Sequence, residues 1–146
     1  MRVASPGERP AKLDDRSAWK ASDFPSPASY RREFSSTMLD EIATAAHNPL
    51  AGGGDLQTVG FRKTDLPNSS EFLIDAYDDV ENGTGFAVLG GLPVAEWGPE
   101  VSRAALAIVG SYFGEITCQN REGEYILDVV DKNAPYDSQS RGYHSN

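Results

Sequence analysis

The chain has 146 residues, the length of one domain or of part of a larger one, and 39% of them are hydrophobic, which is enough for a core. Its net charge is −9, from 22 acidic and 13 basic residues, so binding to nucleic acid or to an anionic membrane surface is disfavoured. The sequence has no apolar run of the roughly 20 residues that a membrane span needs, and its first residues do not resemble a secretory signal, so we expect a cytoplasmic location.

Residues 1–30 are rich in Pro, Ser, Asp and Lys, and we predict an N-terminal arm there. Its main large apolar residues are Trp19 and Phe24. Two interpretations stay open: an extended arm anchored on the fold by Trp19, or a mobile tail.

The first helix is predicted over residues 37–46, where apolar side chains recur on one side. Thr37 would cap its start, with Asp40 in the first turn. The helix would end before Pro49, and His47 would then follow its C-terminus, where a cation is favourable.

The second helix is predicted to start at Asn68, which with Glu71 has the spacing of a capping box. Residues 82–83 (Asn-Gly) would end it in a left-handed conformation. For its acidic residues we favour a solvated face over a cation site; they are Asp75, Asp78, Asp79 and Glu81.

The third helix is predicted to start at Pro99, because proline suits the first helical position. It carries an apolar stripe of Val101, Ala105, Ile108, Val109 and Tyr112.

Three strands are predicted around this helix. Residues 85–91 form an apolar run bounded by glycines, which indicates a buried strand. Residues 115–119 and 125–130 indicate a hairpin that turns at residues 120–123. Cys118, the single cysteine, would be a buried thiol rather than a nucleophile, because it lies in the apolar strand predicted over residues 115–119 and no histidine is near it in the sequence. Three strands cannot close a barrel, which suggests part of a larger domain.

Residues 83–94 (GTGFAVLGGLPV) resemble a strand and turn in the N-terminal half of the taurine dioxygenase-like (TauD/TfdA) family of Fe(II)/2-oxoglutarate-dependent dioxygenases. Further similar segments follow the family's order: residues 19–24 (WKASDF), 65–67 (DLP), 112–115 (YFGE), 128–131 (DVVD) and 140–146 (SRGYHSN). The resemblance covers nearly the whole chain, and the order and spacing of the segments carry it.

The resemblance implies an α+β fold, the N-terminal part of a double-stranded β-helix (jelly-roll, clavaminate synthase-like) with helices on its outside. Residues 31–146 would be the N-terminal portion of the dioxygenase domain, truncated before the iron-binding motif. In the intact protein, Fe(II) held by a His-x-Asp/Glu pair and a distant His would act with 2-oxoglutarate. A small organic substrate would be hydroxylated, with release of succinate and CO2.

The resemblance also bears on site residues. Arg141, Tyr143 and Asn146 would line the substrate pocket, because the segment that enters the iron motif runs along that pocket in this family; a plain polar loop is the alternative. His144 begins a segment similar to His-x-Asp, but Asn146 replaces the acid and the family's motif lies a few residues further on. No metal ligand or catalytic residue is therefore predicted in this chain, and for His47 we favour capping of the C-terminus of the first helix over metal binding.

Two other interpretations stay open. In the first, the chain is a catalytically inactive remnant of the family that acts as a binding or interaction module. In the second, it is an unrelated small α/β domain. The oligomeric state is open between a monomer and a homo-oligomer, and the substrate is not predicted.

Overall fold

The computed structural model describes residues 16–51, 64–121 and 123–127. The chain divides into two units, Met1–Ile116 and Thr117–Asn146. The elements of the first unit are, in order, the 3-10 turns η1 (Ala21–Asp23) and η2 (Pro27–Ser29), β1 (Arg31–Glu33), α1 (Ser36–Ala51), α2 (Ser70–Glu81), β2 (Val88–Gly90) and α3 (Val94–Gly110).

β1 and β2 form a two-stranded parallel sheet, with Arg31 opposite Val88 and Glu33 opposite Gly90. Residues 34–87 connect the strands and include α1 and α2, since parallel strands require a long crossover. The sequence does not predict β1, whose three residues are all charged. β2 lies within the predicted strand of residues 85–91, but the prediction that it is buried is wrong for Val88, which is 37% exposed.

α1 is longer at both ends than predicted. It starts at Ser36, and the Ser35 hydroxyl, not Thr37, accepts a hydrogen bond from the N–H of Met38 (3.3 Å). The helix continues through His47 and Pro49 to Ala51, so Pro49 does not end it as the sequence predicts. His47 therefore lies inside the helix and is exposed, so it does not cap the C-terminus as predicted.

α2 occupies the predicted span, but neither predicted end motif forms. Its N-cap is Ser69, without a side-chain capping bond, and Asn68 bonds elsewhere. At the other end Asn82 has a φ of −121°, so the helix does not end in a left-handed residue. The first positive φ, 84°, occurs later, at Gly85.

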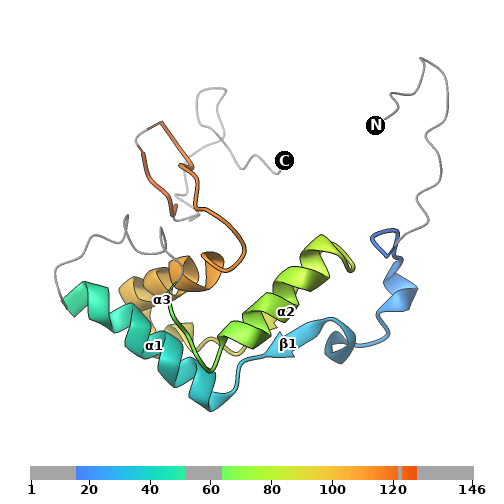
Figure 1. The fold of residues 1–146 in the computed structure, drawn as a ribbon, viewed down its shortest axis with the longest axis horizontal. Coiled ribbons are helices and arrows are strands. Elements are labelled where there is room, and N and C mark those ends of the chain that lie inside the picture. The colour runs from blue at the N-terminus through green and yellow to red at the C-terminus, as the bar shows by residue number, and fades with distance from the viewer. Residues whose placement is uncertain (1–15, 52–63, 122, 128–146) are drawn as a thin grey trace, which may run out of the picture. The chain divides into compact units, whose positions relative to one another are not determined.

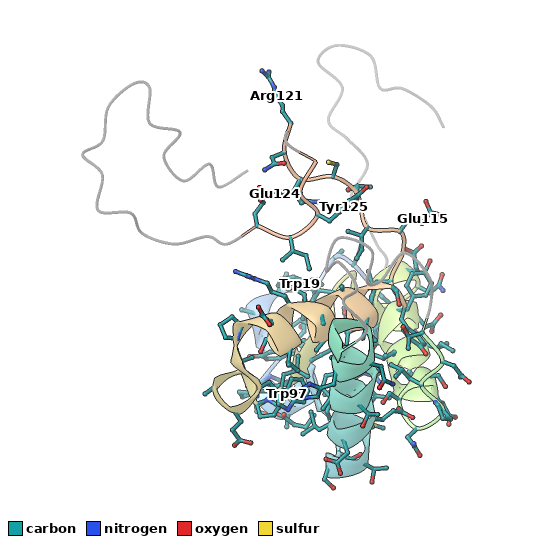
Figure 2. All side chains as sticks on the ribbon, turned by 90° about the vertical axis from the view of Figure 1, so that its left-hand side faces the viewer. Trp19, Trp97, Glu115, Arg121, Glu124 and Tyr125 are labelled. Carbon is teal, nitrogen blue, oxygen red and sulfur yellow. The ribbon has the colours of Figure 1, made fainter. Side chains whose placement is uncertain are left out.

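α3 is helical from Val94 to Gly110 with a break at Gly98, whose φ of 73° and ψ of 173° are not helical. Pro99 directly follows the break, so the main segment starts where the sequence predicts. The short turn before the break carries Trp97, which is half-buried (Figure 2). The predicted apolar stripe is confirmed, because all five of its members are buried.

The core lies where α1 and α3 pack against each other (Figure 1). Small buried side chains on the two helices allow close approach; they are Ala46, Ala104, Ala105 and Ala107. The largest apolar side chains that are completely or almost completely buried are Ile42, Leu66, Leu73 and Ile108.

An aromatic cluster fixes the described part of the N-terminal arm. Trp19 donates its indole N–H to the carbonyl of Thr84 (3.0 Å). Its ring meets those of Phe24 and Phe86 edge-on, at centroid distances of 5.5 and 5.2 Å, and Phe24 also contacts Tyr30 at 5.7 Å. The interpretation of Trp19 as an anchor is therefore confirmed for residues 16–30.

In the second unit, the described residues 117–121 and 123–127 form a closed turn without a strand. The N–H of Gln119 donates to the carbonyl of Glu124 (2.7 Å), and the N–H of Glu124 donates to the Asn120 side chain (2.9 Å). Gly123 permits the turn with a φ of 88°. The prediction of a hairpin is therefore wrong for these residues, because the predicted turn forms but the two strands beside it do not. Residues 128–130 of the second predicted strand lie outside the described part.

Candidate functional site

The residues predicted to contact substrate, Arg141, Tyr143 and Asn146, lie outside the described residues, as does His144. The structure therefore does not place them. Gln119 and Asn120 form the closed turn of the second unit. Arg121 points away from that turn (Figure 2).

Within the described ranges, no three His, Cys, Asp or Glu side chains come together in a way that would hold a metal ion. On α2, the solvated face is confirmed for Asp75, Asp78 and Glu81, which are exposed. Asp79 differs, because it is half-buried and accepts two hydrogen bonds from the guanidinium of Arg32, at 3.1 Å from Nε and 2.5 Å from Nη2. This pair ties β1 to α2.

Cys118 does not have the predicted environment. Its side chain is exposed, and its thiol lies 3.4 Å from the carbonyl of Asn120. The prediction of a buried thiol depended on a strand over residues 115–119, and the structure has no strand there.

A polar junction joins α1 to the start of α2, and we call its members Glu41, Asn68 and Ser69 the Glu41 junction. One oxygen of the Glu41 carboxylate accepts the backbone and side-chain N–H groups of Asn68, both at 2.9 Å. The other oxygen accepts the hydroxyl of Ser69 at 2.5 Å. Ser69 is completely buried, so Glu41 supplies the acceptor that its hydroxyl needs.

The junction keeps Glu41 ionised. Burial alone would raise the pKa of this carboxyl, but the hydrogen bonds from Ser69 and Asn68 together outweigh burial and lower the pKa from its usual 4.5. At neutral pH the group is a carboxylate with three donors on it. That arrangement suits a structural link between helices better than a proton donor.

Tyr112 closes the same region from the end of α3. Its hydroxyl donates to the carbonyl of Thr64 (2.7 Å), just before α2. Burial raises the pKa of Tyr112 above its usual 10.0; the backbone of Leu66 opposes this, and the charges of Asp65 and Glu41 add to it. Tyr112 is therefore neutral at physiological pH and acts as a hydrogen-bond donor.

The sequence reveals neither the link from Glu41 to Asn68 nor the link from Arg32 to Asp79. Glu41 reaches across 27 residues to Asn68, and Arg32 reaches across 47 to Asp79. The one usable signal is charge, since a carboxylate among the apolar residues of α1 and an arginine in a strand both require partners when they are partly buried.

Comparison with known proteins gives one distant similarity. No family model matches the chain. The chain is 23% identical over 133 residues to FR-33289 synthase of Streptomyces rubellomurinus. The match covers 90% of this chain and 39% of the synthase, so the chain spans about two fifths of the length of that relative. The similarity links the chain loosely to an enzyme.

In the described ranges, none of the helices combines the length and the apolar character needed to cross a membrane.

Proposed function

We propose that the intact protein is an Fe(II)/2-oxoglutarate-dependent oxygenase that hydroxylates a small organic molecule, and that this chain is its N-terminal portion. The observation that carries the proposal is the order and spacing of the TauD/TfdA-like segments between residues 65 and 146. The similarity to a synthase supports an enzyme over 133 residues but does not specify the reaction. A cytoplasmic location is part of the proposal on the sequence grounds given above.

The described residues do not fit the iron site of such an enzyme. They include one histidine, His47, which is exposed on α1, and no cluster of potential metal ligands. Under the proposal, residues beyond Asn146 hold Fe(II) and 2-oxoglutarate. When bound, these would supply the oxidising chemistry.

The described residues would contribute a scaffold. The Glu41 junction fixes α1 to α2, Arg32 fixes β1 to α2, and Trp19 fixes the arm to the loop before β2. Each of these links joins segments that are far apart in the sequence. A site built on such a scaffold gains positional precision.

The deciding experiment is to sequence the reading frame beyond codon 146. The proposal expects a His-x-Asp or His-x-Glu motif within a few codons, followed by a distant His and an Arg. The protein from the full frame should then release succinate from 2-oxoglutarate in the presence of Fe(II), and removal of Fe(II) should abolish that release.

A frame that continues without this motif, or stops after Asn146, would refute the oxygenase. The second candidate, an inactive remnant that acts as a binding module, would then be favoured. The observation on its side is the lack of a metal-ligand cluster in the described part of the chain.

A further inference from the structure

Asn82 and Gly83, at the end of α2, form an Asn-Gly pair, the sequence in which an asparagine side chain reacts most readily with the backbone. Glycine has no side chain, so its backbone nitrogen can approach the side-chain carbonyl carbon of the preceding asparagine. Asn82 is exposed, so water reaches its side-chain amide. Asparagine is one of the thermolabile residues of proteins, and this pair is therefore a candidate for covalent change.

The fold requires glycine at position 83. A Cβ there would lie 2.7 Å from the carbonyl oxygen of Asp79 and 2.9 Å from its Cα, which is too close for a side chain. The backbone lies this close because the N–H groups of Gly83 and Gly85 both donate to the Asp79 carbonyl, each at 3.1 Å. The reactive pair is thus a consequence of the tight end of α2.

Hydrogen bonds hold both reacting groups while the last turn of α2 is closed. The nucleophile is the Gly83 nitrogen without its proton, but the closed turn donates that proton to the carbonyl of Asp79. The side-chain amide of Asn82 donates to a carboxylate oxygen of Asp78 (2.7 Å). The reaction therefore requires the turn to open, and helix ends open at low free energy.

We infer that Asn82 is a site of spontaneous deamidation, controlled by opening of the last turn of α2, and that its product releases the Trp19 anchor of the arm. The deprotonated Gly83 nitrogen attacks Cγ of Asn82, the N–Cγ bond forms, and the Cγ–Nδ2 bond breaks. Nδ2 leaves as ammonia, with a proton from water that balances the one lost by Gly83. The product is a cyclic imide.

Water then opens the cyclic imide in one of two ways. Cleavage of the new N–Cγ bond gives aspartate at position 82. Cleavage at the backbone carbonyl carbon gives isoaspartate, in which the main chain runs through the former side chain. The whole reaction consumes one water and releases one ammonia, and no electrons are transferred.

Both products place a negative charge where α2 tolerates it poorly. The C-terminal end of a helix dipole is negative, and α2 has no basic residue in its last turn. The new carboxylate lies four residues after Asp78, and like charges at this spacing destabilise a helix. A carboxylate is also no donor, so the bond from position 82 to Asp78 is lost.

The arm is anchored two residues after Asn82. Trp19 donates its indole N–H to the carbonyl of Thr84 (3.0 Å). Isoaspartate lengthens the main chain by one carbon directly before this segment, so the two N–H groups that now share the Asp79 carbonyl cannot both return to it. The Thr84 carbonyl then moves away from Trp19.

The first test incubates the chain of residues 1–146 at neutral and at mildly alkaline pH and measures deamidation by mass spectrometry of its peptides. Asn120 is the internal comparator, because Arg121 follows it in place of glycine. We expect Asn82 to deamidate at least about tenfold faster than Asn120, as a barrier lower by about 1.4 kcal/mol gives. The rate at Asn82 should rise with pH, because the nucleophile is a deprotonated amide.

A matched pair of variants tests the control by the last turn. Asp78→Ala removes the acceptor of the Asn82 side chain, whereas Asp78→Asn removes the same charge and keeps an oxygen acceptor. Asn82 should deamidate about fivefold faster in the alanine variant than in the asparagine variant, which is the effect of one hydrogen bond of about 1 kcal/mol.

Release of the arm is measured by trypsin cleavage after Lys20, which is exposed and directly follows Trp19. Deamidated protein, separated by ion exchange, should be cut there several-fold faster than unmodified protein. Asn82→Asp adds the charge without lengthening the main chain, so this variant should be cut at an intermediate rate.

Each part of the inference has its own contrary result. Deamidation of Asn82 no faster than that of Asn120 overturns the site. Equal rates in the two Asp78 variants overturn the control by the last turn. Equal cleavage after Lys20 in modified and unmodified protein overturns release of the arm. The inference is independent of the proposed function, because none of these measurements involves iron or 2-oxoglutarate.

Discussion

Removing the Glu41 carboxylate should destabilise the fold, because three hydrogen bonds between α1 and the start of α2 depend on it. In Glu41→Ala, the completely buried Ser69 hydroxyl loses its acceptor, which costs about 1–3 kcal/mol. Asn68 is exposed, so water replaces its lost bonds at about 0.5 kcal/mol. We expect the free energy of unfolding to fall by about 1.5–3.5 kcal/mol. Glu41→Gln keeps an acceptor and should cost about 1 kcal/mol.

The assay is urea denaturation followed by circular dichroism, with Asp40→Ala as the matched control. Asp40 is an exposed carboxylate one position earlier on the same helix. Its removal should change the free energy of unfolding by less than about 0.5 kcal/mol.

The effect should also depend on pH in a defined direction. Because the fold lowers the pKa of Glu41 below 4.5, the carboxylate stabilises the protein above pH 4.5, and this contribution is lost as the pH falls through the lowered pKa. The difference between wild type and Glu41→Gln should therefore be full at neutral pH and shrink in acid. The reasoning is refuted if Glu41→Ala unfolds like Asp40→Ala, or if the difference between wild type and Glu41→Gln is the same at pH 7 and at about pH 3.

Three further predictions concern the arm, the core and Tyr112. Trp19→Ala should lower the free energy of unfolding by about 1–3 kcal/mol and expose the arm to proteolysis. Trp19→Phe keeps an aromatic ring and loses only the indole hydrogen bond, so it should be less sensitive to protease. Equal protease sensitivity of the two variants would count against Trp19 as an anchor. Ile108→Ala, at a position that is 1% exposed, should lower the free energy of unfolding by about 2–5 kcal/mol; Leu106→Ala, at a position that is 57% exposed, should be nearly neutral, and similar losses would show that α3 is wrongly oriented. Tyr112→Phe removes the hydrogen bond to the carbonyl of Thr64 and should lower the free energy of unfolding by about 1 kcal/mol. Because the pKa of Tyr112 is raised, its neutral hydroxyl stabilises the fold below pH 10, and that contribution is lost as the pH rises above 10. When the free energy of unfolding is measured against pH, wild type should therefore lose stability above pH 10 through this group, whereas Tyr112→Phe should not.

The helices were largely predictable, because their signal is local. Apolar spacing locates α2 and the main segment of α3, and Pro99 marks the start of that segment. The ends were less predictable where a distant group competes for the same donor. The sequence pairs Asn68 with Glu71, but Glu41 accepts the N–H of Asn68 instead.

The sheet and the polar links were not predictable from local pattern. β1 is three charged residues without apolar alternation, and it forms a strand only because β2 lies beside it. The environment of Cys118 was misjudged for a related reason, since residues 115–119 have strand-like composition but no neighbouring strand in the described residues. The predicted contacts of Arg141, Tyr143 and Asn146 with substrate remain predictions.

The pairing of β1 with β2 has a consequence for synthesis on the ribosome. Arg31 and Val88, which face each other in the sheet, are separated by 57 positions (88 minus 31). At about 5–20 residues per second, translation needs about 3–11 s to reach the second strand after the first. During this delay β1 has no strand to pair with. Its three charged residues act as gatekeepers in that interval, because a nascent strand of Arg, Arg and Glu resists pairing with neighbouring chains.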